Sequence, residues 1–295
     1  MVSAPAATVR QGVPKEKSFP PPSAHWVSLA RDRWVRYPVG DAGVRRLQEL
    51  LATPARVRMP CMLIYGVSGA GKSMLLEKFQ RDCESAAEQK NGSRLVIAAE
   101  LPPVPQLRSL YAEIIRSMQA NVSPTTRLHE LESTAINMLS HAAPRMLLID
   151  EIHNLLSCNA RDQRAALNAI KYLANKLRVS IVAAGTYEAL HVMRSDPQIA
   201  SRFEQLELPV WTESQELRRF IAGYLSLLPI KRAVVEIDKR FVEYLLELSD
   251  GVTGRVIEVL RRAAYQGLAD KSRRVGLQQL QYVGARLPAV IGRRA

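Results

Sequence analysis

Eight consecutive residues, Gly66 to Ser73, have types and a spacing suited to binding phosphate. They match the pattern G-x-x-x-x-G-K-[ST] of a P-loop. Glycines let successive backbone N–H groups point at a polyphosphate, and the dipole of a following helix adds positive charge. We expect Lys72 to bridge the β and γ phosphates and the Ser73 hydroxyl to bind Mg²⁺. The predicted nucleotide-binding residues here are Gly66, Val67, Ser68, Gly69, Ala70, Gly71, Lys72, Ser73 and Met74.

The flanking sequence favours a P-loop over an ordinary glycine-rich turn. Residues 60–65 are short, apolar and bounded by a proline, as in a buried strand, and residues 74–79 have helical spacing. A P-loop requires this strand–loop–helix context, and the chain supplies all three parts.

Two acids, Asp150 and Glu151, follow an apolar run, where a buried strand would end. Ligands bind at this edge of an open α/β sheet. Asp150 is expected to hold Mg²⁺, directly or through water, and Glu151 to polarise an attacking water as a general base. A solvated strand end is the alternative, but it fits a lone acid better than a pair that follows a P-loop.

The run from Asp150 to His153 also spells the acidic box of superfamily-2 helicases. Those proteins carry two such sheet domains, and this chain has room for one. His153 is interpreted as a neighbour of the site and not as a catalyst.

Three further residues are candidates by their position. Thr186 ends the next apolar strand, where a hydroxyl would sense the γ-phosphate or orient the water; the alternative is a helix N-cap. Arg202 precedes the last predicted strand and is either a finger that reaches a neighbouring subunit's γ-phosphate or a surface ion-pair arginine. Arg255 opens a C-terminal helix and is a candidate to fold back onto the nucleotide.

Apolar strands alternate with helices through the middle of the chain. Strands are predicted at 60–65, 94–99, 145–151, 179–184 and 205–210, with helices between them. Continuously apolar strands indicate a parallel sheet covered on both faces, so the fold class is α/β with a five-stranded parallel sheet sandwiched by helices.

After this region the pattern is helical only, at about 213–228, 238–249, 254–267 and 276–286, with Thr212 and Gln215 predicted to form a capping box. The predicted units are a mobile N-terminal segment (1–24), an arm with a helix (25–56), the nucleotide-binding α/β domain (57–211) and a small all-α lid with a basic tail (212–295).

The composition favours a polyanionic partner, nucleic acid before membrane. The 295 residues carry a formal net charge of +13 at pH 7, although a generally basic, solvated surface is the alternative. Three cysteines far apart form no disulfide framework, and five histidines show no metal-ligand spacing. No apolar run approaches the length of a membrane span, so we expect a cytoplasmic protein without a membrane partner.

The order of these motifs resembles that of the AAA+ ATPases, in which an α/β P-loop domain precedes a helical lid. Longer segments are similar to the TniB family of transposition ATPases, which is related to TnsC and more distantly to MuB. They are residues 34–38, 58–60, 150–156, 167–175 and 185–189. The resemblance implies that ATP and Mg²⁺ bind, and that Thr186, Arg202 and Arg255 are sensor 1, arginine finger and sensor 2. The P-loop interior Val-Ser-Gly-Ala departs from the polar residues frequent in the family.

The same resemblance implies an ATP-dependent, non-sequence-specific binder of double-stranded DNA that forms a homo-oligomeric ring or helical filament. It would mark target sites and recruit or activate a DDE transposase, with a target-selector protein as a further candidate partner. Slow ATP hydrolysis, stimulated by DNA or partners, would disassemble it. Two alternatives stay open: a helicase loader or replication initiator, and an ATP-gated DNA-binding scaffold with negligible hydrolysis.

Residues that would contact DNA are less determined. In an AAA+ ring the loops after the second strand tend to face the central channel, where side chains contact phosphates without recognising sequence. Helix caps and solvated side chains are the alternative. The candidates are Arg108, Thr125, Thr126 and Arg127.

Overall fold

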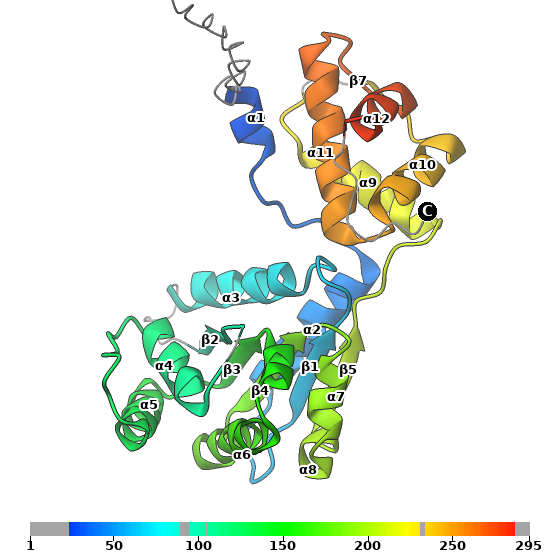
Figure 1. Ribbon diagram of the computed structural model, residues 1–295. Helices are drawn as coiled ribbons and strands as arrows, with labels where there is room; N and C mark the ends of the chain where they lie inside the picture. The colour runs from blue at the N-terminus through cyan, green and yellow to red at the C-terminus, as the bar shows by residue number, and fades with distance from the viewer. Residues whose placement is uncertain (1–23, 89–94, 104, 231–233, 287–295) are drawn as a thin grey trace, which may run out of the picture.

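The computed structural model describes residues 24–88, 95–103, 105–230 and 234–286 (Figure 1). Nearly all of the segment expected to be mobile, residues 1–24, lies outside the described residues, as does the end of the basic tail, residues 287–295. Within the described part of the chain, none of the helices is long and apolar enough to span a membrane.

A five-stranded parallel sheet forms the centre of the α/β domain, in the order β2-β3-β4-β1-β5. Its apolar strands are buried as their sequences predict, and the fold-class prediction is confirmed. The last strand begins at Phe203, two residues before the predicted start. The strands are β1 (Cys61–Tyr65), β2 (Val96–Glu100), β3 (Met146–Asp150), β4 (Ser180–Gly185) and β5 (Phe203–Glu207).

Helices cover both faces of this sheet because alternate strand residues point to opposite sides. In β3, Met146 and Leu148 join the core under α2 (Pro38–Ala52) and α3 (Lys72–Glu88). Leu147 of the same strand joins the core on the other face.

The second face is covered by α4 (Leu107–Ser117), α5 (Leu128–Ala142) and α6 (Ala160–Leu177). Shorter helical segments follow β3 and β4: η1 (Ile152–Ser157), α7 (Ala189–Arg194) and α8 (Pro197–Ala200).

The lid has a hydrophobic core of its own, formed by α9 (Gln215–Leu227), α10 (Lys239–Ser249), α11 (Thr253–Ala269) and α12 (Leu277–Gly284). A two-residue parallel pair, β6 (Val234–Val235) with β7 (Arg274–Val275), was not expected. The predicted capping box at Thr212 is wrong. Ser214 is the N-cap of α9, because its extended backbone lets its side chain accept the Leu217 N–H.

The N-terminal arm packs on the lid. Its helix α1 (Ala24–Leu29) lies beside α11 in Figure 1, and Leu29 is fully buried in the lid core. The ring of Trp26 meets Tyr265 edge-on, with 5.3 Å between the ring centroids. Trp26 and Leu29 therefore serve packing within the chain.

The junction between the α/β domain and the lid is tightly packed. The backbone N–H of Trp211 donates to Gly251 O at 2.7 Å. Tyr37, at the end of the arm, contacts the rings of Trp211 and Phe220. Burial and, less strongly, Asp41 raise the pKa of Tyr37 to about 12, as expected for a phenol in dry surroundings.

Gly251 is the position where this junction tolerates no side chain. Its φ is +68°, and a Cβ there would lie 2.2 Å from the Trp211 carbonyl oxygen. We predict that Gly251→Ala lowers the free energy of unfolding by about 2 kcal/mol or more, through strain and overlap with rigid backbone. Chemical denaturation followed by circular dichroism measures the loss. In the matched control Gly276→Ala the nearest atom is 3.4 Å away, so a loss as large as that at Gly251 would contradict this explanation.

Candidate nucleotide-binding and catalytic site

The loop between β1 and α3 has the backbone conformation of a phosphate cradle. Gly69 and Gly71 have φ values of +80° and +100°, which side-chain-bearing residues rarely adopt. The loop leads directly into α3, which begins at Lys72. The positive end of that helix therefore faces the loop.

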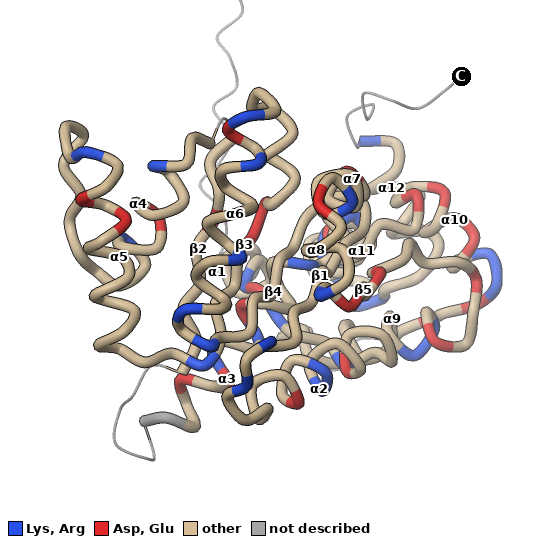
Figure 2. Tube along the Cα trace, turned by 90° about the horizontal axis from the view of Figure 1, so that it is seen from below, with Lys and Arg blue, Asp and Glu red and all other residues tan. Residues whose placement is uncertain are grey.

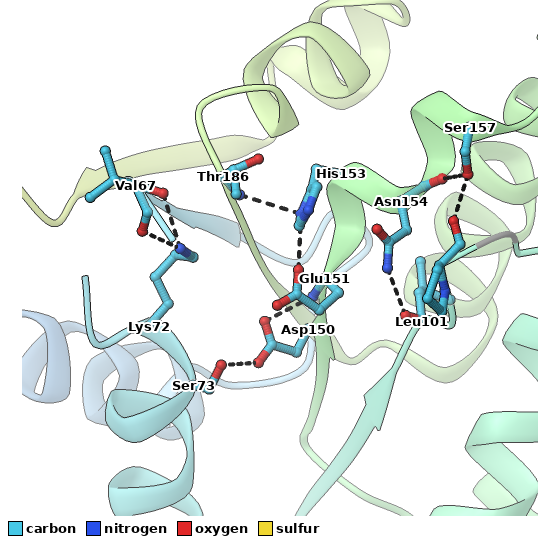
Figure 3. A network of polar contacts seen from close by, with 12 residues as sticks. Val67, Lys72, Ser73, Leu101, Asp150, Glu151, His153, Asn154, Ser157 and Thr186 are labelled. Atoms are coloured by element: carbon cyan, nitrogen blue, oxygen red, sulfur yellow. Dashed lines mark hydrogen bonds and ion pairs between the residues drawn. The ribbon is translucent and has the colours of Figure 1, made fainter. Parts of the chain in front are cut away.

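Lys72 folds back onto this loop. Its ammonium donates to Gly66 O at 3.0 Å and to Val67 O at 2.8 Å (Figure 3). Burial lowers the pKa of Lys72, and the nearby charges of Glu151 and Asp150 oppose that shift. The residue as a whole is only 6% exposed. The loop carbonyls thus hold the Lys72 ammonium at the P-loop, where it can bind a phosphate.

Ser73 and Asp150 are brought together from two segments of the chain. The Ser73 hydroxyl donates to Asp150 Oδ2 at 2.6 Å, and Asp150 Oδ1 accepts the Glu151 N–H at 2.8 Å. A hydroxyl and a carboxylate are the hard oxygen ligands that Mg²⁺ takes together with phosphate and water. The pair fits a magnesium ion, which Ser73 and Asp150 would hold and which would supply charge to offset that of the phosphates.

Glu151, His153 and Thr186 meet beside this pair. Glu151 has a left-handed backbone (φ 55°, ψ 36°) at the end of β3, and its Oε2 lies 3.1 Å from His153 Nδ1. The Thr186 backbone N–H donates to the same Nδ1 at 3.4 Å. Figure 3 shows the three residues converging from the ends of β3 and β4 and from η1.

A cavity of about 330 Å³ joins the P-loop to these residues. It is large enough for the phosphates of a nucleotide and carries donors on the loop side and a carboxylate on the other. Chemically, such an arrangement can bind a polyphosphate and activate a water beside its terminal group. The lining consists of Ser68, Gly69, Gly71, Lys72, Ser73, Met74, Glu151, His153 and Thr186.

The lid reaches the P-loop through its backbone. The Gly254 N–H at the start of α11 donates to Gly69 O at 2.9 Å. The adjacent Arg255 pairs with Asp250 and is not part of the cavity lining. The lid therefore contacts the loop, but the side chain of Arg255 points elsewhere in this structure.

Arg202 lies at the end of the sheet where the strands begin, opposite the end that carries the cavity. Its carbonyl accepts the Cys61 N–H at the start of β1, and its guanidinium donates to Asn175 Oδ1 at 2.7 Å. The P-loop follows the other end of β1. Arg202 consequently cannot reach the cavity of its own subunit.

The residues nominated for DNA contact do come together. Arg108, at the start of α4, donates to Thr126 O at 2.6 Å, and the Thr125 and Ser123 hydroxyl oxygens are 2.9 Å apart. Arg127 is the N-cap residue of α5, and its N–H donates to Glu130. The two connectors therefore lie side by side, with hydrogen bonds that satisfy their own backbone.

His153, expected to be a neighbour of the site, lies in the cavity wall. Its position three residues after Asp150 was a signal, but its partner Thr186 is 33 residues away. Only the pairing of β3 with β4 brings the two together.

Comparison with known proteins places the chain in a family. The model described as "Bacterial TniB protein" matches residues 25–213. A search of the curated proteins finds no significant match.

Solved structures show the same fold. The Aeropyrum pernix ORC2 protein (ADPNP-ADP complexes) has a TM-score of 0.67 at 18% identity, covering 89% of this chain and 72% of that chain. The Aeropyrum pernix ORC1 protein in complex with DNA has a TM-score of 0.67 at 22% identity, covering 89% and 69%. Drosophila ORC bound to DNA has a TM-score of 0.59 at 15% identity, covering 95% and 69%.

At these identities the structural likeness shows an AAA+ fold and no more. The family match covers more than half of the chain and includes the arm, the P-loop and the Asp150–Glu151 pair. The protein belongs to the TniB family.

Proposed function

We propose that the protein is an ATP-hydrolysing transposition regulator. It assembles on duplex DNA without sequence specificity, selects target sites and recruits or activates a DDE transposase. The observation that carries this proposal is the cavity in which Lys72, Ser73 and Glu151 meet within a TniB-family chain. In this proposal Lys72 binds the β and γ phosphates, Ser73 and Asp150 hold Mg²⁺, and Glu151 is the general base.

The charge of the chain supports a DNA partner. The net charge is +13, and two of the similar solved structures are titled as DNA complexes of those proteins. We assign phosphate contacts to Arg108, Thr125, Thr126 and Arg127, which lie together beyond the end of β2. Such contacts bind any sequence and weaken with salt.

Assembly into a homo-oligomer is supported by a basic edge without acidic partners. Six basic residues lie in the last turn of α6 and in the loops that precede β1, β3, β4 and β5, and none pairs with a carboxylate among the described residues. Figure 2, seen from below, shows basic positions around the beginnings of these strands. The six are Arg56, Arg58, Arg145, Lys176, Arg178 and Arg202.

The opposite end of the sheet carries acids in the last positions of the strands and just after them, including Glu100, Asp150 and Glu151. Two edges of opposite charge suit a head-to-tail contact between copies. In that contact we infer that Arg202 of one subunit acts on the nucleotide of the next.

The direct test is binding to random-sequence duplex DNA with ADP, ATP or a non-hydrolysable ATP analogue over a series of salt concentrations. We expect binding with ATP and the analogue but not with ADP, and rings or filaments in electron micrographs. Replacing both Arg108 and Arg127 by alanine is expected to reduce the slope of log affinity against log salt by about 2. Binding that ignores the nucleotide contradicts the proposal.

Glu151→Gln tests whether ATP hydrolysis controls release from DNA or whether the protein binds DNA as a scaffold with negligible hydrolysis. Because the amide cannot accept a proton, we expect kcat to fall about 100-fold or more while ATP affinity changes little. The variant is then expected to stay on DNA after excess competitor is added, as measured by fluorescence anisotropy. If it dissociates as fast as the unmodified protein, hydrolysis does not control release.

Mixing two inactive variants tests Arg202 in trans. Arg202→Ala keeps its own pocket but lacks the finger, whereas Lys72→Ala has the finger but a pocket that binds ATP poorly. We expect each alone to be inactive and the mixture to recover about a quarter of the unmodified ATPase rate, as random mixing of two subunit types predicts. Arg45→Ala, an exposed arginine of α2, serves as the control. A mixture as inactive as its components contradicts the trans assignment.

A further inference from the structure

One ring nitrogen of His153 contacts two different residues of the cavity. Nδ1 lies 3.1 Å from Glu151 Oε2 and 3.4 Å from the Thr186 backbone nitrogen (Figure 3). Both distances allow a hydrogen bond. In this structure the Thr186 N–H donates to Nδ1, whereas the Glu151 contact is a short N···O distance that becomes a hydrogen bond only with a proton on Nδ1.

These two contacts require opposite chemistry at Nδ1. An ionised Glu151 carboxylate can only accept, so it needs a proton on Nδ1, whereas the Thr186 N–H can only donate, so it needs the Nδ1 lone pair. A ring nitrogen offers one or the other. The two hydrogen bonds are therefore mutually exclusive.

The segment that carries His153 is anchored on both sides of the residue. Ile152 is fully buried, and Asn154 secures η1 by donating from Nδ2 to Leu101 O and from its backbone N–H to Glu151 O, both at 2.9 Å. A Cβ on Gly185 would lie 3.2 Å from Nδ1, so the glycine leaves room for the ring at the end of β4. A ring fixed in this way can orient a neighbouring carboxylate.

We propose that His153 is a positioning residue that links Thr186 to the orientation of Glu151 through Nδ1. A terminal phosphate at the end of β4 attracts the Thr186 N–H and withdraws it from the ring. The ring then changes tautomer through water: Nε2 releases its proton to water and Nδ1 takes one from water. Nδ1–H donates to Glu151 and holds its carboxylate toward the cavity. This inference rests on the proposed ATPase function, since it concerns the general base of that reaction.

Three substitutions of His153 distinguish positioning from packing. The amide of asparagine places a polar atom near the position of Nδ1, whereas that of glutamine reaches the position of Nε2. We expect kcat for ATP to fall about tenfold in His153→Ala and His153→Gln, with KM and nucleotide affinity within about twofold. His153→Asn is expected to keep kcat within about threefold of the unmodified protein.

A double substitution and a surface control complete the kinetic test. In the Glu151→Gln background His153→Ala is expected to lower the residual rate no further, because the base to be oriented is absent. His129→Ala, on the exposed face of α5, controls for loss of any histidine. Thermal melts and nucleotide titrations confirm that each variant folds. An unchanged or raised kcat in His153→Ala, or rescue by glutamine equal to that by asparagine, overturns the proposal.

The ¹⁵N chemical shift of His153 Nδ1 tests the link to Thr186 without measuring turnover. Adding the non-hydrolysable ATP analogue is expected to move Nδ1 toward the protonated range. A shift that does not change with the analogue overturns the link. If the unmodified protein hydrolyses no ATP, the proposed function fails; if it does and His153→Ala is equally active, only this inference fails.

Discussion

The hydrogen bond between Ser73 and Asp150 depends on the whole α/β domain. Its donor and acceptor are 77 residues apart and meet at 2.6 Å. They meet because β1 and β3 run parallel with β4 between them, so the segments that follow all three strands reach one edge of the sheet. Glu151, His153 and Thr186 reach the cavity through the same pairing. A change of strand order would leave the P-loop intact and remove the carboxylates from it.

The lid adds a second constraint, because a backbone hydrogen bond joins it to the P-loop. Gly254 donates to Gly69 O, and the Trp211 indole donates to the Thr253 hydroxyl at 3.1 Å beside it. Tyr37 of the arm packs against Trp211 in the same cluster. A rotation of the lid therefore disturbs the loop directly. In an assembly, this is a physical route by which contacts made far from the nucleotide affect how it is bound.

The elements that the sequence predicted correctly are those with a strong local signal. Apolar runs located all five strands of the sheet, and helical periodicity located α6 and the lid helices within a few residues. The features that the sequence did not predict correctly lack a strong local signal. Strands β6 and β7 have two residues each, too few for any periodic pattern, and the N-cap moved from Thr212 to Ser214 because both hydroxyls satisfy the same preference. Which of the two caps the helix depends on the backbone path out of β5.

For the site, the sequence by itself determined the P-loop and the Asp150–Glu151 pair, since each consists of residues that are consecutive in the chain. Only the tertiary structure decided which residues meet across segments. It placed His153 between Glu151 and Thr186, and it turned Arg255 to Asp250 and away from the cavity. The physical reason is that periodicity records which side chains are buried, whereas a contact between distant residues depends on strand order and on packing, which no local pattern contains.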